Sequence, residues 1–361
     1  MMTYKIGVLN GDDIGPEVVP VAVSVIKEAV KGFDDIDIDW QELPVGFPSY
    51  LERGETLPEI TLQTLPDLDA WILGPIGHMA YPKDDPKAIN PHPILRRKFD
   101  LMSNIRPARS YPTIRSLHQD VDIVIIRENN EGFQPDRNMF IGQAEFMPTP
   151  DMALSVRVIS RRNSEFVART AFELARQRNG KKKVTAIHKD TVFKIGCGLF
   201  METVREVANG YPDIQLEDRV VDTFAMNLVM KPQDFDVVVT TNMFGDILSD
   251  EAAGLVGGLG MAPGLCVGPD YMMAQATHGS APDIAGKNIA NPFAMVKSAQ
   301  MMFACLGEKK KDSSLVKAAD LVQQGLDKVL RDMKTVTPDL GGTAGTLQMG
   351  EAICDAINSF A

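Results

Sequence analysis

One stretch of the chain joins an apolar run to a pair of carboxylates. The run Val237-Val-Val-Thr240 is rich in β-branched residues, which is typical of a strand, and the segment after it has helical character. Asp246 and Asp250 are four residues apart in that segment, so both carboxylates project from one face of a helix. The sequence therefore predicts two carboxylates at the C-terminal edge of a sheet.

These two carboxylates have the chemistry of a divalent-cation site. Mg²⁺ and Mn²⁺ prefer hard oxygen ligands and usually keep some water or substrate oxygens in their coordination shell. A charged helix face that simply meets solvent shows the same spacing. Asp246 and Asp250 can therefore be interpreted as a metal site or as part of a solvated surface, and the residues around them in the fold decide between the two.

Beyond this stretch the chain alternates predicted strands and helices, which indicates an α/β protein. Strands are predicted at 5–9, 36–43, 70–73, 184–191 and 218–222, and helices at 16–30, 164–178, 292–306, 313–332 and 345–358. The segment 138–161 contains two prolines before an alternating stretch. We expect it to form a hairpin arm that serves a subunit interface.

Composition limits the class of protein. A chain of 361 residues with 44% hydrophobic residues can bury a large core in about two domains. It has no run of about 18 apolar residues and no signal-peptide pattern, which predicts a cytoplasmic protein without membrane partners. The net charge of −11 disfavours nucleic acid as a partner. The four cysteines are scattered without a Cys-x-x-Cys pair, which argues against disulfides and zinc.

Three arginines lie near predicted strand ends. Arg96 and Arg106 are ten residues apart, and Arg127 directly follows an apolar run. A guanidinium matches a carboxylate with two parallel hydrogen bonds, so three of them could bind a small polyacid. Three separate surface arginines are the alternative.

Further polar residues are expected at the same edge of the sheet. Lys189 lies at the end of the predicted strand 184–191, where a lysine can act as an acid or base if its pKa is lowered; a solvated lysine is the alternative. Asp222 is predicted to end another strand and to add a third carboxylate. Asp283 lies in a loop rich in glycine and proline, and could accept hydrogen bonds from a ribose diol.

Together these motifs resemble those of the isocitrate/isopropylmalate/tartrate dehydrogenase family, in collinear order over essentially the whole chain. The most specific are Asn242-Met-Phe-Gly-Asp-Ile-Leu-Ser-Asp250 and His278-Gly-Ser-Ala-Pro-Asp-Ile-Ala-Gly286. The resemblance implies an α/β fold that is not a Rossmann fold, with a mixed central sheet flanked by helices. It implies a large nucleotide-binding domain from residues 1–102 and 257–361, and a small domain from 103–256 that carries the dimer contact and the arm.

The resemblance also implies an active site shared between two subunits of a homodimer. Arg96, Arg106 and Arg127 would bind the carboxylates of a malate-like substrate. A Mg²⁺ or Mn²⁺ ion would be bound by Asp246 and Asp250 of one subunit and by Asp222 of the other. The catalytic residues would be Lys189, which helps to deprotonate the C2 hydroxyl, and Asp222 beside it.

The loop that begins at His278 resembles the nucleotide-binding loop of the family. The residues implied to bind the cofactor are His278, Gly279, Ser280, Ala281, Asp283, Ile284 and Asn291. Asp283 and Ile284 match the form that prefers NAD, because a carboxylate would repel a 2′-phosphate, whereas the form that prefers NADP has Lys and Tyr there.

Several positions depart from the pattern of the family. Gln134 stands where the family has a Tyr that is thought to protonate the product of decarboxylation, and glutamine has no titratable proton. Asp13 replaces a usual glycine, and Gln275 a usual Glu. The loop 87–93 matches no known signature for isopropylmalate, isocitrate or homoisocitrate. The expected activity is therefore oxidation followed by decarboxylation of a substrate such as 3-isopropylmalate, D-malate or tartrate. The alternatives are a dehydrogenase without decarboxylation and a catalytically impaired ligand-binding homologue.

Overall fold

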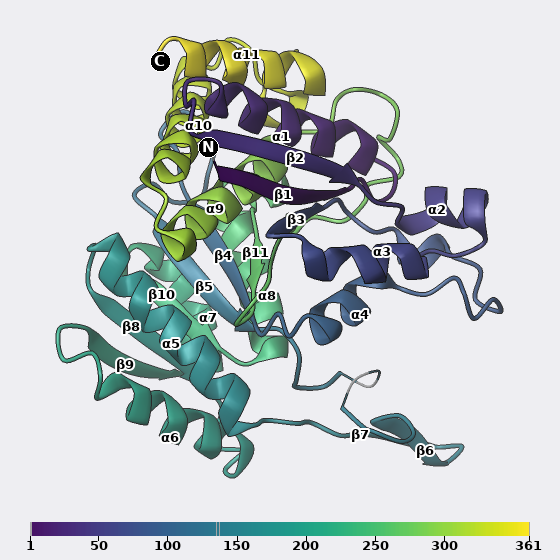
Figure 1. Ribbon diagram of the computed structural model, residues 1–361. Coiled ribbons are helices and arrows are strands. Elements are labelled where there is room, and N and C mark those ends of the chain that lie inside the picture. Colours follow the sequence, from purple (N-terminus) through teal and green to yellow (C-terminus); the bar gives the residue numbers. More distant parts are fainter. Residues whose placement is uncertain (1, 135, 137, 361) are drawn as a thin grey trace.

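A computed structural model describes residues 2–134, 136 and 138–360 of the chain. Its centre is a mixed sheet of ten strands in the order β2-β1-β3-β12-β11-β4-β5-β10-β8-β9 (Figure 1). The strands are β1 (Met2–Leu9), β2 (Ile36–Glu42), β3 (Ala70–Leu73), β4 (Ser103–Arg109), β5 (Asp122–Glu128), β8 (Lys183–His188), β9 (Gln215–Val220), β10 (Val237–Thr240), β11 (Leu265–Val267) and β12 (Met272–Ala274). Strand β11 is antiparallel to both of its neighbours, and β4 is antiparallel to β5.

Half of the sheet, from β2 to β11, has helices on both faces. Four long helices cover one face, namely α1 (Gly15–Val30), α9 (Phe293–Lys310), α10 (Ser313–Asp332) and α11 (Thr346–Asn358). Three shorter helices lie on the other side, namely α2 (Gly46–Arg53), α3 (Glu59–Thr64) and α4 (Pro91–Lys98). The terminal segments of the chain thus share one core, because β1 and α1 pack with α9 to α11.

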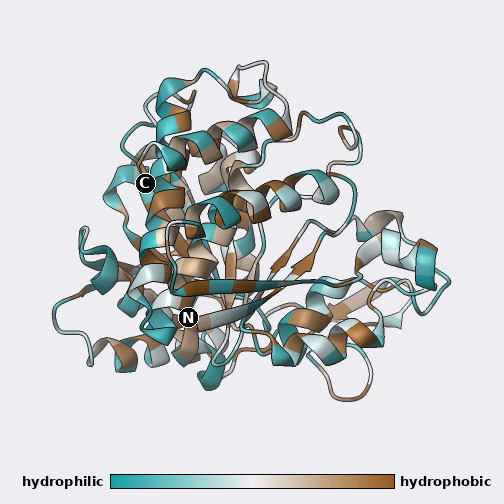
Figure 2. Ribbon diagram, turned by 45° about the horizontal axis from the view of Figure 1, so that its top comes forward, coloured by the Kyte–Doolittle hydropathy of each residue, from teal (hydrophilic) through white to brown (hydrophobic). Residues whose placement is uncertain are grey.

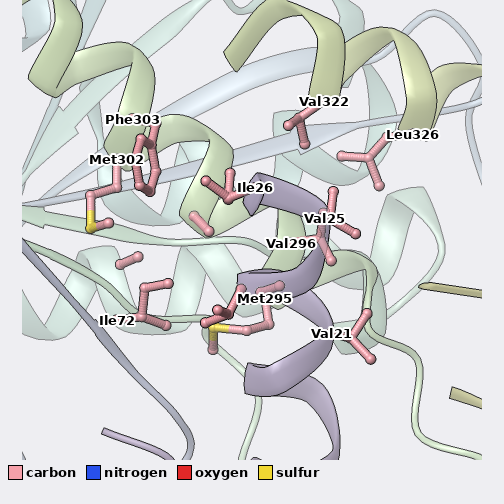
Figure 3. Packing of buried hydrophobic residues seen from close by; sticks show 14 of the residues in the cluster. Val21, Val25, Ile26, Ile72, Met295, Val296, Met302, Phe303, Val322 and Leu326 are labelled. Carbon is pink, nitrogen blue, oxygen red and sulfur yellow. The ribbon is translucent and has the colours of Figure 1, made fainter. Parts of the chain in front are cut away.

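Helix α10 shows how the sequence produces this packing. Asp312 caps its first turn by accepting hydrogen bonds from the backbone amides of Ser314 and Leu315, which stabilises the helix start. Val322 and Leu326 recur at helical spacing on the buried face, where they pack with residues of α1 and α9 (Figure 3). The opposite face is polar, and this alternation recurs in the other outer helices (Figure 2).

The other half of the sheet, from β4 to β9, has its own two cores. Helices α5 (Arg161–Arg178) and α6 (Gly196–Ala208) pack on one face, and α7 (Val221–Met230) and α8 (Asn242–Val256) on the other. Side chains alternate along β5, so Val124 and Ile126 meet the first pair of helices while Ile123 and Ile125 meet the second. Arg127 follows the same alternation and faces α8.

A two-stranded arm projects from this half of the molecule (Figure 1). Its strands are β6 (Glu145–Thr149) and β7 (Met152–Ser155), and every residue of both is exposed. The hairpin predicted within 138–161 is therefore present, although its strands end at Ser155.

Most predicted elements are confirmed, including the strand at 70–73 and the helix at 313–332. One prediction was wrong: Asp222 does not end a strand, because β9 stops at Val220 and Asp222 lies in the first turn of α7. Within the described residues, no helix is long and apolar enough to cross a membrane.

Candidate active site

Helix α8 crosses strands β4 and β5 at very short range, and Gly245 makes this approach possible. A Cβ atom at Gly245 would lie 2.7 Å from the Cβ atom of Arg127, closer than real side chains approach. The glycine of the Asn-x-Phe-Gly-Asp motif therefore has a packing role. It brings the carboxylates of the next turns of α8 against the arginines of the sheet.

Two arginines and two aspartates form the centre of the site. Nη1 of Arg106 lies 3.1 Å from Oδ1 of Asp246 and 3.7 Å from Oδ1 of Asp250. Arg127 donates a short hydrogen bond to the same oxygen of Asp246. Arg106 also donates to the hydroxyl of Ser249, at 2.8 Å. The structure thus brings together four of the predicted site residues.

Burial gives this cluster unusual electrostatics. Desolvation lowers the pKa of Arg106, and it lowers that of Arg127 to about 9, with the charge of Arg106 adding to the effect. Desolvation also raises the pKa of Asp250, although Arg106 opposes the rise. The Nε atom of Arg106 is buried and has no hydrogen-bond partner among the described residues. Buried donors of this kind favour an anionic ligand.

Arg96 reaches the site from α4 and is held by Gln275. Nη2 of Arg96 donates to Oε1 of Gln275 at 3.0 Å, and Nε2 of the same glutamine lies 2.7 Å from Nε2 of His92. Because arginine can only donate, the Arg96 contact fixes the orientation of the Gln275 amide. The Nε atom of Arg96 is buried and unpaired in the described part of the chain, as is that of Arg106.

Gln134 joins the site through Asn242, the first residue of α8. The Oδ1 atom of Asn242 accepts from Nη2 of Arg127 at 2.7 Å and from Nε2 of Gln134 at 3.3 Å. Gln134 also lines a cavity of about 560 Å³, together with Asn90, Ile94 and Arg97. The side chain of Gln134 therefore lies between the arginines and this cavity beside α4.

Lys189 and Asp222 form a separate pair within the chain. Nζ of Lys189 lies 3.0 Å from Oδ2 of Asp222, and this hydrogen bond lowers the pKa of Asp222. No hydrogen bond or ion pair joins the pair to Asp246 or Asp250 among residues 2–134, 136 and 138–360. The chain therefore presents two half-sites, one with the arginines and one with the lysine.

The donor set of one chain fits part of a divalent-cation site. The side chains of Asp246 and Asp250 are 52% and 54% exposed, so both carboxylates can reach a ligand. The described residues of the single chain contain no group of three His, Cys, Asp or Glu side chains that could bind a metal. Two hard oxygen ligands from α8 suit Mg²⁺ or Mn²⁺ if a further carboxylate comes from elsewhere.

The loop predicted to bind the nucleotide packs against the N-terminal loop. The backbone amide of Ile14 donates to the carbonyl of Ser280 at 3.2 Å. Asp12 ties the neighbouring segments together, because its carboxylate accepts hydrogen bonds from the amides of Phe47 and Gly77 and from the Tyr81 hydroxyl. Asp13 has φ 51°, a left-handed conformation that suits the glycine usual in the family.

The other predicted cofactor residues lie along the same loop. Burial lowers the pKa of His278, and its Nε2 atom has no partner in the described part of the chain. Ala281 has φ 48°, while Gly279 and Asp283 are exposed. Asn291 donates to Asp339 at 2.9 Å and accepts from the amide of Phe293, which starts α9. Ile284 packs at the margin of the core.

Comparison with known proteins identifies this arrangement. The family model for isocitrate/isopropylmalate dehydrogenase matches residues 5–353. The chain belongs to this family. It is 39% identical to 3-isopropylmalate dehydrogenase of Methanothermobacter thermautotrophicus, over 98% of each chain, and 40% identical to isocitrate/homoisocitrate dehydrogenase of Thermus thermophilus, over 99% and 100%. The crystal structure of isocitrate dehydrogenase from Methylococcus capsulatus superposes with a TM-score of 0.85 at 39% identity, covering 98% and 99%.

Membership of the isocitrate/isopropylmalate dehydrogenase family makes the protein a dehydrogenase that acts on the CH–OH group of a 2-hydroxy acid. The family acts on small carboxylates and typically uses NAD or NADP with a divalent metal. The predicted fold is confirmed as well, with its mixed ten-stranded sheet.

Some residues of the site were not predicted from the sequence. Asn242 and Ser249 both contact the arginines, and both lie inside the specific motif of α8, which was the available signal. His92 precedes Arg96 by one helical turn and contacts Gln275, but nothing in the local sequence indicates that contact.

Proposed function

We propose that this protein is a metal- and NAD-dependent dehydrogenase of a malate-type 2-hydroxy acid, such as 3-isopropylmalate, D-malate or tartrate, and that decarboxylation follows oxidation. The observation that carries the proposal is the placement of Arg106 and Arg127 against Asp246, together with the buried Nε atom of Arg106, which has no hydrogen-bond partner among the described residues. Arg96 adds a third guanidinium from α4. These donors suit a substrate with two carboxylates.

The residues of α8 supply the position for the metal. Asp246 and Asp250 would hold Mg²⁺ or Mn²⁺ together with Asp222 of the partner subunit. When bound, such an ion supplies Lewis acidity at the carboxylate and C2 oxygens of the substrate. Arg106 and Arg127 hold the substrate carboxylates next to that position, which orients the C2 hydrogen for transfer to the nicotinamide.

Lys189 is proposed to help remove the proton from the C2 hydroxyl. Oxidation removes a hydride from C2 and a proton from its oxygen, and Nζ of Lys189 from the partner subunit would move that proton. Asp222 holds the lysine at 3.0 Å, which limits the positions of its amine. Loss of CO₂ from the resulting β-keto acid then requires a proton at C3, where Gln134 provides none.

The proposed active site requires a homodimer. The Lys189–Asp222 pair and the Asp246–Asp250 pair do not meet within the described part of one chain. Large apolar side chains are nevertheless exposed on α7 and α8, including Met226, Val229, Met230, Met243 and Ile247. An exposed apolar surface of this kind favours a subunit interface. The exposed arm would extend that interface.

We also propose the domain division 1–102 with 257–361, and 103–256. Separate apolar cores on the two halves of the sheet support this division, because α1 packs with α9 to α11 whereas α5 and α6 pack on β5, β8 and β10. The first unit would bind the nucleotide through His278, Gly279, Ser280, Ala281, Asp283, Ile284 and Asn291.

NADH formation with a panel of acids tests the proposed reaction. D-malate, tartrate, 3-isopropylmalate and isocitrate would each be offered with NAD and Mn²⁺ or Mg²⁺. We expect at least one malate-type acid to be oxidised, and no turnover after chelation of the metal. Absence of NADH with every acid, from a protein shown to be folded and dimeric, would instead support the impaired ligand-binding homologue. Oxidation without CO₂ release would support the alternative dehydrogenase, which Gln134 favours.

A further inference from the structure

A second cavity lies on the face of the sheet opposite to the α8 arginines. Its volume is about 270 Å³, and it opens between α5 on one side and α9 and α10 on the other. Ile105 and Arg109 of β4 line it, whereas Arg106, between them in sequence, faces α8. Because side chains alternate along a strand, this cavity is separated from the proposed active site by the sheet itself.

Lys297 of α9 provides a buried positive charge in this cavity. Its Nζ atom donates to Oε1 of Gln300 at 2.7 Å and, by a shorter contact, to Oε1 of Gln323. Both partners are neutral, and an ammonium has three donors, so one N–H has no partner among the described residues. Desolvation lowers the pKa of Lys297 to about 8, although the charge of Asp327 opposes the fall. An anion in the cavity would offset the free-energy cost of burying this charge.

Arg109 places a second cation at the cavity. Its guanidinium lies 5.2 Å from the ring centre of Tyr111, and its nearest carboxylate oxygen, of Asp327, is 4.0 Å away. Most of its hydrogen-bonding capacity is therefore open. Arg178 also lines the cavity, but it is already paired with Asp122 and Asp236, each at 3.0 Å. Lys297 and Arg109 are thus the cations available to a ligand.

Most of the remaining lining is apolar, although Tyr111, Gln323 and Asp122, which is paired with Arg178, also line the cavity. Its wall includes Leu174 of α5, Met261, Phe293 and Met301. These side chains come from both apolar cores of this face, because Phe293 belongs to the core of α1 and α9, and Leu174 to that of α5 and α6. A ligand that fits must therefore combine one anionic end with a short apolar body. A polycarboxylate would bury charge against the methionines without a partner.

We propose that this cavity binds a small monocarboxylate with a short aliphatic tail. The carboxylate would accept hydrogen bonds from Lys297 and Arg109, and the tail would lie against Phe293 and Met301. A cavity of about 270 Å³ is just below the range of about 300–1,000 Å³ found for drug-sized ligands, so a body of four to six carbons is about the limit. The proposal concerns binding alone and does not depend on the reaction at the other face of the sheet.

Titration of the protein with 4-methylpentanoate, followed by calorimetry and ligand-detected NMR, tests this site. We expect binding by the wild type, and at least about tenfold weaker binding of the uncharged 4-methylpentan-1-ol, because a charge-assisted hydrogen bond is lost. Lys297→Met should weaken binding by a similar factor. Lys317→Met, at an exposed position of α10, is the matched control and should leave binding unchanged.

Two further variants keep the test decisive. Arg109→Gln removes the second cation at a half-exposed position and should also weaken carboxylate binding. Arg96→Gln alters the proposed substrate site and should leave binding unchanged. The proposal is overturned if the folded wild type binds no 4-methylpentanoate at roughly 10 mM, a weak limit even for a small ligand. Equal binding by wild type and Arg109→Gln, or loss of binding in Arg96→Gln, would also overturn it.

Discussion

Arg106 donates from one nitrogen, Nη1, to Asp246 at 3.1 Å and to the Ser249 hydroxyl at 2.8 Å, while its Nε atom stays buried without a partner among the described residues. The arginine thus holds the first carboxylate of α8 and keeps a donor for a ligand. This relationship connects the proposed substrate and metal sites, so a change at either residue should affect both.

Asp246→Asn removes one proposed metal ligand. It also removes the negative charge that partly compensates the buried positive charges of Arg106 and Arg127. We expect kcat/KM to fall by at least about 10²-fold, with a higher metal concentration needed for half-maximal activity. We also expect the free energy of unfolding to fall by roughly 1–3 kcal/mol, measured by urea denaturation. Glu251→Gln, at the carboxylate that follows Asp250 in α8, is the control. An Asp246→Asn enzyme with unchanged metal dependence would exclude Asp246 as a ligand.

Mixing two inactive variants tests whether the active site is shared between subunits. Lys189→Ala and Asp246→Asn should each be inactive alone, but one site of a mixed dimer would have both residues intact. After denaturation and refolding of equal amounts together, we expect about a quarter of the wild-type activity, because half of the dimers are mixed and each has one good site. No recovery, with mixed dimers shown by mass spectrometry, would place both residues in one chain.

The proton needed after decarboxylation gives a prediction for Gln134. General-acid catalysis is typically worth about 10²–10⁴-fold, and Gln134 cannot provide it. Gln134→Tyr should therefore raise the CO₂ released per NADH formed, while hydride transfer changes little. Both products would be measured in the same reaction, with trapping of the keto acid. If the wild type already releases one CO₂ per NADH without a trapped intermediate, another group or a water supplies the proton.

Cofactor preference is predicted from Asp283, which is exposed on the loop after His278. A carboxylate beside the 2′-phosphate of NADP costs on the order of 1–3 kcal/mol, so kcat/KM should favour NAD by roughly tenfold to a hundredfold. Asp283→Lys together with Ile284→Tyr should reduce or reverse this ratio. Equal kcat/KM for both cofactors in the wild type would refute the assignment.

The buried amine of Lys297 predicts a pH-dependent stability. Desolvation lowers its pKa from the ordinary lysine value of 10.5 to about 8 in the folded protein, so below pH 8 the folded state bears the penalty of a buried charge. Because the unfolded chain binds more protons between these values, this penalty disappears as the pH rises from 8 to about 10.5.

Replacing Lys297 should therefore stabilise the protein most at neutral pH. We expect Lys297→Met to raise the free energy of unfolding by about 1–3 kcal/mol at pH 7, and the gain to shrink towards pH 10. The charged groups around the amine are Arg109, Asp122, Asp320 and Asp327. Lys317→Met should show no such trend. A gain that is the same at both pH values would contradict the prediction.

The local sequence was sufficient to predict the elements and the family. Apolar runs and helical spacing located the strand at 70–73 and the helix at 313–332, because burial of one face repeats at short intervals along the chain. The spacing of Asp246 and Asp250 likewise placed both carboxylates on one face of α8. Asp222 was assigned to the wrong element, because the change from β9 to α7 occurs within two residues.

Only the tertiary structure decided which side chains meet. Arg106 and Asp246 are 140 residues apart, and their contact depends on Gly245, which lets α8 approach β5. Gln275 contacts both His92 and Arg96, which precede it in the sequence by 183 and 179 residues. The cavity at Lys297 has no sequence motif, because its walls include residues of β4, β5, α5, α9 and α10, and because the charge of Lys297 is significant only through burial. Pairwise contacts between distant segments follow from packing of the whole chain, and no local pattern contains them.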